Sequence, residues 1–177
     1  MNFVKTATKD LKRISAKEFK TSPKVPIILM ADHIRSGHNV GSLFRIADAF
    51  GLEEVLLVGY TVKPPHPEIN KTALGATETV NWKHFEHPEE YLTLKKSEGY
   101  RIMAVEQTDG SQFLHQLHFN QDEKYVLIFG NEVNGVSDSV LSLCDECIEI
   151  PQKGTKHSLN VSVAAGLVTW HIFAHFL

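Results

Sequence analysis

Short apolar runs alternate along the chain with segments whose apolar residues recur at helical spacing. Apolar runs of strand length are typical of strands buried on both faces of a sheet. They lie at residues 26–32, 54–58, 100–105, 124–129 and 146–150. Helices are predicted between and after them, at residues 39–50, 68–74, 88–98, from Ser137 onward, and at the C-terminus. Strands that alternate with helices predict an α/β domain whose parallel sheet is covered on both faces.

The helix predicted at residues 39–50 has recognisable ends and two distinct sides. Its apolar stripe consists of Val40, Leu43, Ala47 and Phe50. Asn39 is suited to the N-cap, and Gly51 to the position that follows the last helical turn. Asn39, Ser42 and Arg45 lie along one side, away from the apolar stripe, because successive helical residues turn by about 100°. We expect this polar side of the helix to lie at the carboxyl end of the first strand.

Ligands of open parallel sheets bind beyond the carboxyl ends of the strands. The segment 129–135 follows a buried strand directly and places Gly130 and Gly135 on either side of Glu132. Glycine allows the backbone to approach a ligand closely, and Glu132 adds a carboxylate at the sheet edge. This segment is a candidate binding loop.

The most informative part of the chain is residues 150–166. Ile150 and Pro151 end a strand, and a polar loop that contains Gly154 follows. We expect an apolar helix after this loop, with Ser158 and Asn160 in its first turn. Polar side chains and free backbone groups that gather at a helix start can form a ligand pocket from main chain.

Composition limits the class of protein. The chain has 177 residues, of which 42% are hydrophobic, enough for one domain with a single core. The longest apolar stretch, 161–177, is interrupted by polar residues and is interpreted as a buried helix, not a membrane span. No signal peptide is visible, and two cysteines make no disulfide framework, so a reducing cytoplasm is expected. Cys144 and Cys147 are interpreted as buried, inert thiols, and no metal site is expected.

Charge is distributed unevenly. The net charge is −3, but residues 1–24 hold seven basic and two acidic residues, which gives +5 and leaves −8 on the rest. A basic arm on an acidic body can bind nucleic acid locally, although a solvated leading segment has the same composition.

Three ordered motifs resemble those of the SpoU/TrmH-type RNA ribose 2′-O-methyltransferases of the SPOUT superfamily. They are Asn-x-Gly-Ser-x-x-Arg from Asn39, Gly-x-Glu-x-x-Gly from Gly130, and Ile-Pro-x-x-Gly-x-x-x-Ser-Leu-Asn-Val-Ser-Val-Ala from Ile150. Their order and spacing match across residues 26–175. The resemblance implies a parallel-sheet SPOUT fold with a deep C-terminal trefoil knot, an exception to the rule that chains stay unknotted. It also implies a catalytic domain at residues 25–177, preceded by a basic RNA-contacting arm at 1–24.

The resemblance further implies S-adenosylmethionine as the cofactor and particular residues for each role. The cofactor-binding residues would be Gly130, Ile150, Pro151, Gly154, Ser158 and Leu159. The catalytic residues would be Arg45, Asn39, Glu132, Ser158 and Asn160. Arg45 would act either as a base activated by a substrate phosphate or as a cation that stabilises the developing alkoxide. Family members are usually homodimers, which suits the C-terminal helix because it has no fully polar face.

The substrate implied by the resemblance is structured RNA. The short segment before the first strand favours tRNA over ribosomal RNA. The sequence lacks the basic C-terminal extension of some tRNA-modifying relatives, which weakens the assignment to tRNA. A non-catalytic RNA-binding module, or a base or small-molecule methyltransferase on the same scaffold, stays as an alternative. Candidate RNA contacts are Lys9, Lys12, Arg13, Arg35 and Lys156.

Overall fold

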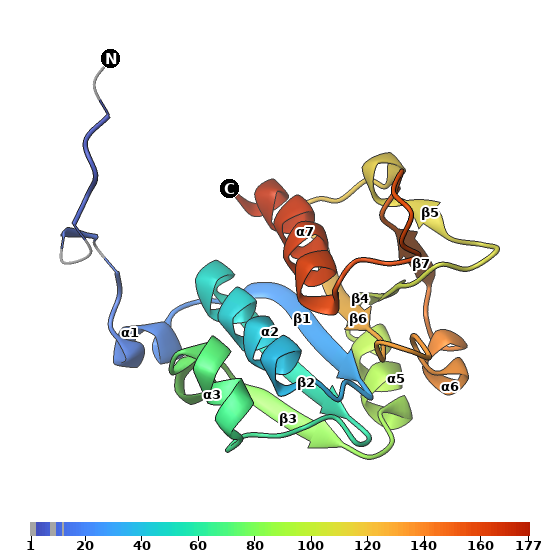
Figure 1. The fold of residues 1–177 in the computed structure, drawn as a ribbon, viewed down its shortest axis with the longest axis horizontal. Coiled ribbons are helices and arrows are strands. Elements are labelled where there is room, and N and C mark those ends of the chain that lie inside the picture. Colours follow the sequence, from blue (N-terminus) through green and yellow to red (C-terminus); the bar gives the residue numbers. More distant parts are fainter. Residues whose placement is uncertain (1–2, 8–9, 12) are drawn as a thin grey trace.

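The computed structural model describes residues 3–7, 10–11 and 13–177. Within these residues a parallel sheet has the strand order β3-β2-β1-β6-β4-β7-β5 (Figure 1). The strands are β1 (Val25–Asp32), β2 (Leu52–Val58), β3 (Trp82–Phe85), β4 (Tyr100–Val105), β5 (Gln112–Phe113), β6 (Lys124–Phe129) and β7 (Glu146–Glu149). The α-helices are α1 (Ala16–Thr21), α2 (Gly37–Phe50), α3 (Pro67–Ala73), α4 (Ala76–Thr79), α5 (Glu89–Ser97), α6 (Asp138–Leu141) and α7 (Val161–Phe173). Two short 3₁₀ helices are η2 (Leu114–Gln116) and η3 (Ala174–Phe176).

Helices cover both faces of the sheet, as the apolar runs predicted. On β1, Leu29 joins the core cluster that contains residues of α2, α3 and α7, while Met30 joins the cluster formed with α5 and α6. Both side chains are fully buried. Side chains of a strand point alternately to opposite faces, so a continuous apolar run is what a strand covered on both sides requires.

Helix α2 begins two residues earlier than predicted, and the assignment of Asn39 as its N-cap was wrong. Ser36 is the N-cap, and its Oγ accepts a hydrogen bond from the backbone N–H of Asn39 at 3.3 Å. Serine caps a helix about as well as asparagine does. The Asn39 side chain is therefore free for another partner. The other end was predicted correctly, because Gly51 has the left-handed conformation, with φ of 62°.

Helix α7 begins at Val161, so the prediction that Ser158 lies in its first turn was wrong. Asn160 is the N-cap, and its Oδ1 accepts a hydrogen bond from the backbone N–H of Ser162 at 2.8 Å. Ser158 therefore stays in the loop. The helix is also only partly buried: Val168 and Ile172 lie in the core, whereas other apolar residues of α7 are exposed. No helix in the described part of the chain is long and apolar enough to cross a membrane.

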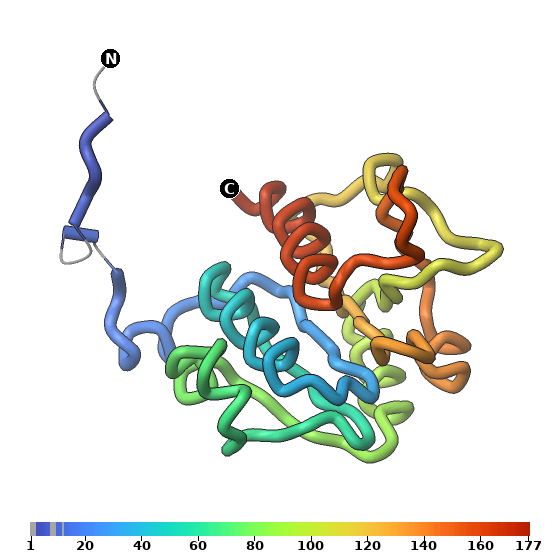
Figure 2. Tube along the Cα trace, in the orientation of Figure 1, coloured from blue at the N-terminus to red at the C-terminus, as the bar shows by residue number. Residues whose placement is uncertain are grey.

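The C-terminal chain returns from β7 to pack α7 beside α2 (Figure 2). Phe50 at the end of α2 stacks on Phe173, with ring centroids 4.8 Å apart, and lies 5.8 Å from Trp170. This packing brings the start of α7 to the carboxyl edge of the sheet, where β1, β4, β6 and β7 end. The trefoil knot implied by the resemblance stays a prediction.

Candidate cofactor and catalytic site

A cavity of about 390 Å³ lies beyond the carboxyl ends of β4, β6 and β7. Its wall comes from three stretches of chain that are far apart in sequence, together with the first turn of α7. The lining residues after these strands include Glu106, Gly130, Asn131, Glu132, Ile150, Ser158, Leu159 and Asn160. The size is within the range of small-molecule sites, and the position is where ligands of parallel sheets bind.

The loop after β6 folds back on itself at its two glycines. Asn131 and Gly135 exchange two backbone hydrogen bonds, both 2.9 Å long. A Cβ atom on Gly130 would lie 2.2 Å from the backbone carbon of Gly135, so no larger residue fits there. Gly135 has φ of 69°, and a Cβ there would lie 2.2 Å from the Glu106 carboxylate. Glu106 also accepts the backbone N–H of Val136 at 2.9 Å, which fixes the loop against β4.

Glu132 connects this loop to the start of α2. Its Oε1 accepts a hydrogen bond from Asn39 Nδ2 at 2.9 Å, and its two oxygens accept the backbone N–H groups of Arg35 and Ser36 at 3.4 Å each. Partial burial would raise the pKa of Glu132, but the hydrogen bonds from Asn39 and from backbone N–H groups outweigh it and lower the pKa. Glu132 is therefore an ionised carboxylate at neutral pH, held between two loops.

Arg45 is exposed on α2, and it does not line the cavity of this single chain. Among the described residues it makes no ion pair, with Glu132 or with any other carboxylate. The structure thus brings together Asn39 and Glu132 from the first two motifs, but not Arg45. The role of Arg45 stays a prediction.

The third motif is divided between the cavity and the surface. Ile150, Ser158, Leu159 and Asn160 line the cavity, and their roles toward a ligand stay predictions. Pro151 and Gly154 are exposed and lie outside the lining, as does Lys156. Within the exposed loop at residues 151–157, Gln152 lines the cavity.

Three of the five candidate RNA contacts lie in the described part of the chain. Lys9 and Lys12 lie outside the described residues, while Arg13 and Lys156 are exposed. The guanidinium carbon of Arg35 lies 5.3 Å from the centre of the Tyr60 ring. Of the three candidates that the structure describes, Arg35 alone is bonded to a residue of the site, through its backbone hydrogen bond to Glu132.

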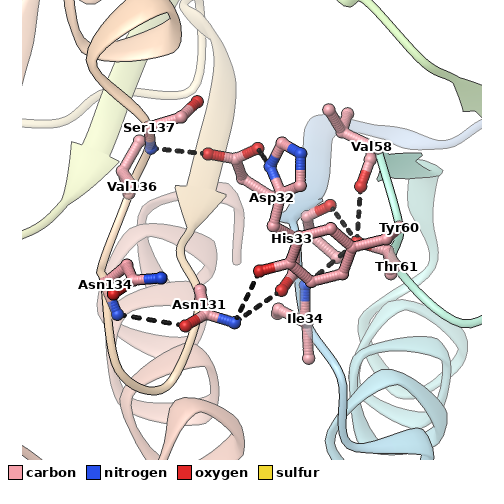
Figure 3. Close-up of polar contacts among 12 residues, drawn as sticks. Asp32, His33, Ile34, Val58, Tyr60, Thr61, Asn131, Asn134, Val136 and Ser137 are labelled. Atoms are coloured by element: carbon pink, nitrogen blue, oxygen red, sulfur yellow. Dashed lines mark hydrogen bonds and ion pairs between the residues drawn. The ribbon is translucent and has the colours of Figure 1, made fainter.

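A network of buried polar groups lies next to the site, and the sequence did not predict it. Asp32, the last residue of β1, is fully buried. It accepts the backbone N–H of Ser137 at 2.7 Å and contacts His33 Nδ1 at 2.7 Å (Figure 3). Asn131 donates from Nδ2 to the His33 carbonyl at 2.8 Å. A charged residue at the end of an apolar run was the only sequence signal for this network.

The two cysteines, which have the spacing of a metal or redox site, are not bonded to each other. Cys144 and Cys147 are free thiols, partly buried. Burial, with smaller contributions from Cys147 and Asp145, raises the pKa of the Cys144 thiol to about 12, so it is unreactive at neutral pH. In the described part of the chain no three metal-ligating side chains are grouped to hold an ion.

Together these features define a parallel α/β domain whose ligand cavity is formed by loops at the carboxyl edge of its sheet. The sequence profile of the SpoU rRNA Methylase family matches residues 26–170. The chain belongs to this family.

Characterised relatives in the family act on different RNAs. The chain is 34% identical over 146 residues to the mouse tRNA (guanosine(18)-2′-O)-methyltransferase TARBP1, with 81% of this chain and 9% of the relative covered. It is 32% identical over 143 residues to the Neisseria meningitidis 23S rRNA (guanosine-2′-O-)-methyltransferase RlmB, with 81% and 56% covered. The chain thus spans little more than half of the second relative and a small part of the first.

Solved structures share the fold. The crystal structure of the TrmH/SpoU tRNA modifying enzyme of Aquifex aeolicus superimposes with a TM-score of 0.80 at 26% identity, over 90% of this chain and 80% of that one. The AdoMet-bound rRNA methyltransferase of Sinorhizobium meliloti has the same TM-score at 24% identity, over 88% and 58%. The parallel-sheet SPOUT fold is thereby confirmed.

Proposed function

We propose that this protein transfers a methyl group from S-adenosylmethionine to a ribose 2′-hydroxyl of structured RNA. The observation that carries the proposal is that residues of all three motifs meet at one sheet edge. Gly130, Glu132, Ile150 and Leu159 line a single cavity, and Asn39 is hydrogen-bonded to Glu132. The mouse and Neisseria relatives are guanosine 2′-O-methyltransferases of RNA, which supports the same reaction class.

The cavity suits S-adenosylmethionine in size and lining. Ile150 and Leu159 offer apolar contact for a nucleobase, and Gly130 of the glycine loop lines the same cavity. The carboxylates of Glu106 and Glu132 lie in the wall and suit a cationic ligand. When bound, the cofactor supplies a methyl group on a sulfonium, so the protein has to align the reactants and assist proton removal. Ser158 would contact the ligand from the cavity wall, and Pro151 and Gly154 would contact it from the exposed part of the same loop.

The catalytic residues of the site would be Arg45, Asn39, Glu132, Ser158 and Asn160. Glu132 orients Asn39, and Asn160 holds the start of α7. An arginine is protonated at neutral pH and is a poor base by itself. Arg45 would therefore stabilise the alkoxide that develops on the ribose, or remove its proton once a substrate phosphate holds it.

A homodimer formed through α7 would complete the site. One side of α7 exposes apolar residues at helical spacing, namely Val163, Leu167 and Trp170, followed by Leu177 at the chain end. Such a stripe is larger than scattered surface residues and suits a symmetric interface. Because α7 packs against α2, a partner there would lie near the helix that carries Arg45.

Structured RNA is the proposed partner, with tRNA favoured and ribosomal RNA as the second candidate, since relatives of both kinds match. The basic segment 1–24, including Lys9, Lys12 and Arg13, would add phosphate contacts outside the catalytic domain at 25–177. Arg35 and Lys156 would add contacts nearer the cavity.

Substitution of Arg45 tests the assignment. We expect Arg45→Ala to lower kcat for RNA methylation by at least about 100-fold, the effect of removing one stabilising group from a reacting centre. Calorimetry should show nearly unchanged affinity for S-adenosylmethionine, because Arg45 does not line the cavity. Arg45→Lys keeps the positive charge but loses the guanidinium geometry, so its activity shows which of the two the reaction requires. Equal loss of cofactor affinity and of methyl transfer would instead assign Arg45 a structural role.

A further inference from the structure

An exposed aromatic and cationic surface lies beside the cavity, beyond the ends of β1 and β2. It consists of His33, Arg35 and Tyr60, here named the Tyr60 platform. The rings of His33 and Tyr60 are 4.5 Å apart at 63°, and the Arg35 guanidinium carbon lies 5.3 Å from the Tyr60 ring centre. Half of the Tyr60 surface is exposed, at 50%. A planar cation and an aromatic ring thus meet in solvent.

Buried polar residues fix the side chains of the platform. The Tyr60 hydroxyl accepts a hydrogen bond from Asn131 Nδ2 at 3.2 Å, and Asp32 contacts the His33 ring (Figure 3). His33 has φ of 58°, which is unusual for a residue other than glycine. Gly59 lies so close that a Cβ there would be 2.1 Å from His33 Nε2. Backbone held in sparsely populated conformations is concentrated at functional sites.

The platform is also adjacent to the proposed reacting groups. Asn131, which fixes the Tyr60 hydroxyl, lines the cavity, and so does its neighbour Glu132. The backbone N–H of Arg35 is bonded to the Glu132 carboxylate. An isolated exposed tyrosine needs no explanation. A tyrosine fixed at its hydroxyl, paired with a guanidinium and next to a cofactor cavity differs from that ordinary case.

We propose that the Tyr60 platform stacks an unpaired nucleobase of the RNA, next to the ribose that is methylated. The inference rests on the proposed function and adds a base-binding surface to it. Unpaired bases are bound by stacking on aromatic rings and on arginine planes, whatever the base. The platform offers flat surfaces and a positive charge, so it binds a nucleotide without selecting its sequence. Selection of the RNA then depends on whether an unpaired base can reach this edge of the sheet.

Tyr60→Ala and Tyr60→Phe test the proposal, with Leu94→Ala as the matched control. Leu94 is exposed to a similar extent, at 54%, on α5, which covers the other face of the sheet. We expect Tyr60→Ala to weaken binding of a fluorescent single-stranded RNA oligonucleotide roughly tenfold, within the range for loss of one stacked base. Tyr60→Phe keeps the ring and should bind like the wild type. Loss of the hydrogen bond from Asn131 should lower Tm slightly in both Tyr60 variants. Cofactor affinity should stay unchanged in all three variants.

Arg35 provides a second readout. Arg35→Lys keeps the positive charge but loses the planar guanidinium. It should therefore weaken binding of the oligonucleotide at low salt and at high salt alike. Wild-type affinity in folded Tyr60→Ala would overturn the proposal, and so would equal losses in Tyr60→Phe and Tyr60→Ala.

The same experiments separate this inference from the proposed function. If the wild type methylates RNA and Tyr60→Ala keeps the wild-type KM for RNA and its oligonucleotide affinity, the platform alone is refuted. If the wild type binds the oligonucleotide through Tyr60 but methylates no RNA, the platform stands and the proposed reaction is refuted. Absence of oligonucleotide binding by the wild type refutes the platform.

Discussion

Glu132 connects the loop after β6 to the loop after β1 by accepting hydrogen bonds from Asn39 Nδ2 and from the backbone N–H groups of Arg35 and Ser36. The sequence predicted that Asn39 and Glu132 belong to one site, but it placed Asn39 at a helix cap. Either Ser36 or Asn39 can cap a helix, and local sequence does not say which side chain has a distant partner. The partner of the Asn39 side chain is Glu132, 93 residues away in the sequence, and only the folded structure shows this contact.

Glu132→Gln tests this connection through its pH dependence. A carboxylate whose folded pKa is lowered stabilises the fold above its unfolded pKa, near 4.5, and loses this contribution as pH falls through the folded value. The wild type should therefore be more stable than Glu132→Gln at neutral pH, and the difference should disappear in acid. The difference should be small, because Glu132 is exposed and screened by solvent. Thermal unfolding of both proteins from pH 7 to pH 3 measures it; a constant difference would contradict the account.

At the scale of elements, continuous apolar runs made β1, β4 and β6 predictable because both faces of these strands are buried. β4 and β6 have the predicted bounds. β3 has four residues, none of them fully buried, and β5 has two exposed residues, so neither carries an apolar pattern. α1 was not predicted either, although Ser15 and Glu18 form a capping box at its start.

The glycine loop after β6 is the element on which the cavity depends. We expect Gly130→Ala to lower the free energy of unfolding by about 2–3 kcal/mol, because the added Cβ would meet backbone atoms that cannot move aside. Affinity for S-adenosylmethionine should fall with it, since the loop forms the cavity wall. Gly110→Ala is the matched control, as nothing lies within 4 Å of a Cβ there. Chemical denaturation and calorimetry give both quantities. Wild-type values in Gly130→Ala would show that the loop tolerates a side chain.

At the scale of the whole molecule, two features have no signal in the periodicity of the sequence. One is the proposed dimer, because the apolar pattern of α7 does not distinguish burial in the core from burial against a partner. The other is the predicted knot, since threading is a property of the chain path and leaves no trace in local patterns. Both follow from the family resemblance, and the exposed stripe on α7 supports the first.

Leu167→Glu tests the dimer. Leu167 is 47% exposed in the single chain. A symmetric interface would bring two such glutamates together in an apolar contact, and we expect the dissociation constant to rise by on the order of 100-fold. Analytical ultracentrifugation should then show a dimer for the wild type and for Leu94→Glu, and a monomer for Leu167→Glu. RNA methylation should be lost with the dimer. A monomeric, fully active wild type would contradict the proposed assembly.

The most direct test of the central claim is to incubate the protein with undermodified total RNA and methyl-labelled S-adenosylmethionine, followed by nucleoside analysis of the labelled RNA. We expect label in a 2′-O-methylated nucleoside of tRNA or ribosomal RNA, and none with Arg45→Ala. Label on a nucleobase, or no transfer by a wild-type protein that binds the cofactor, would contradict it.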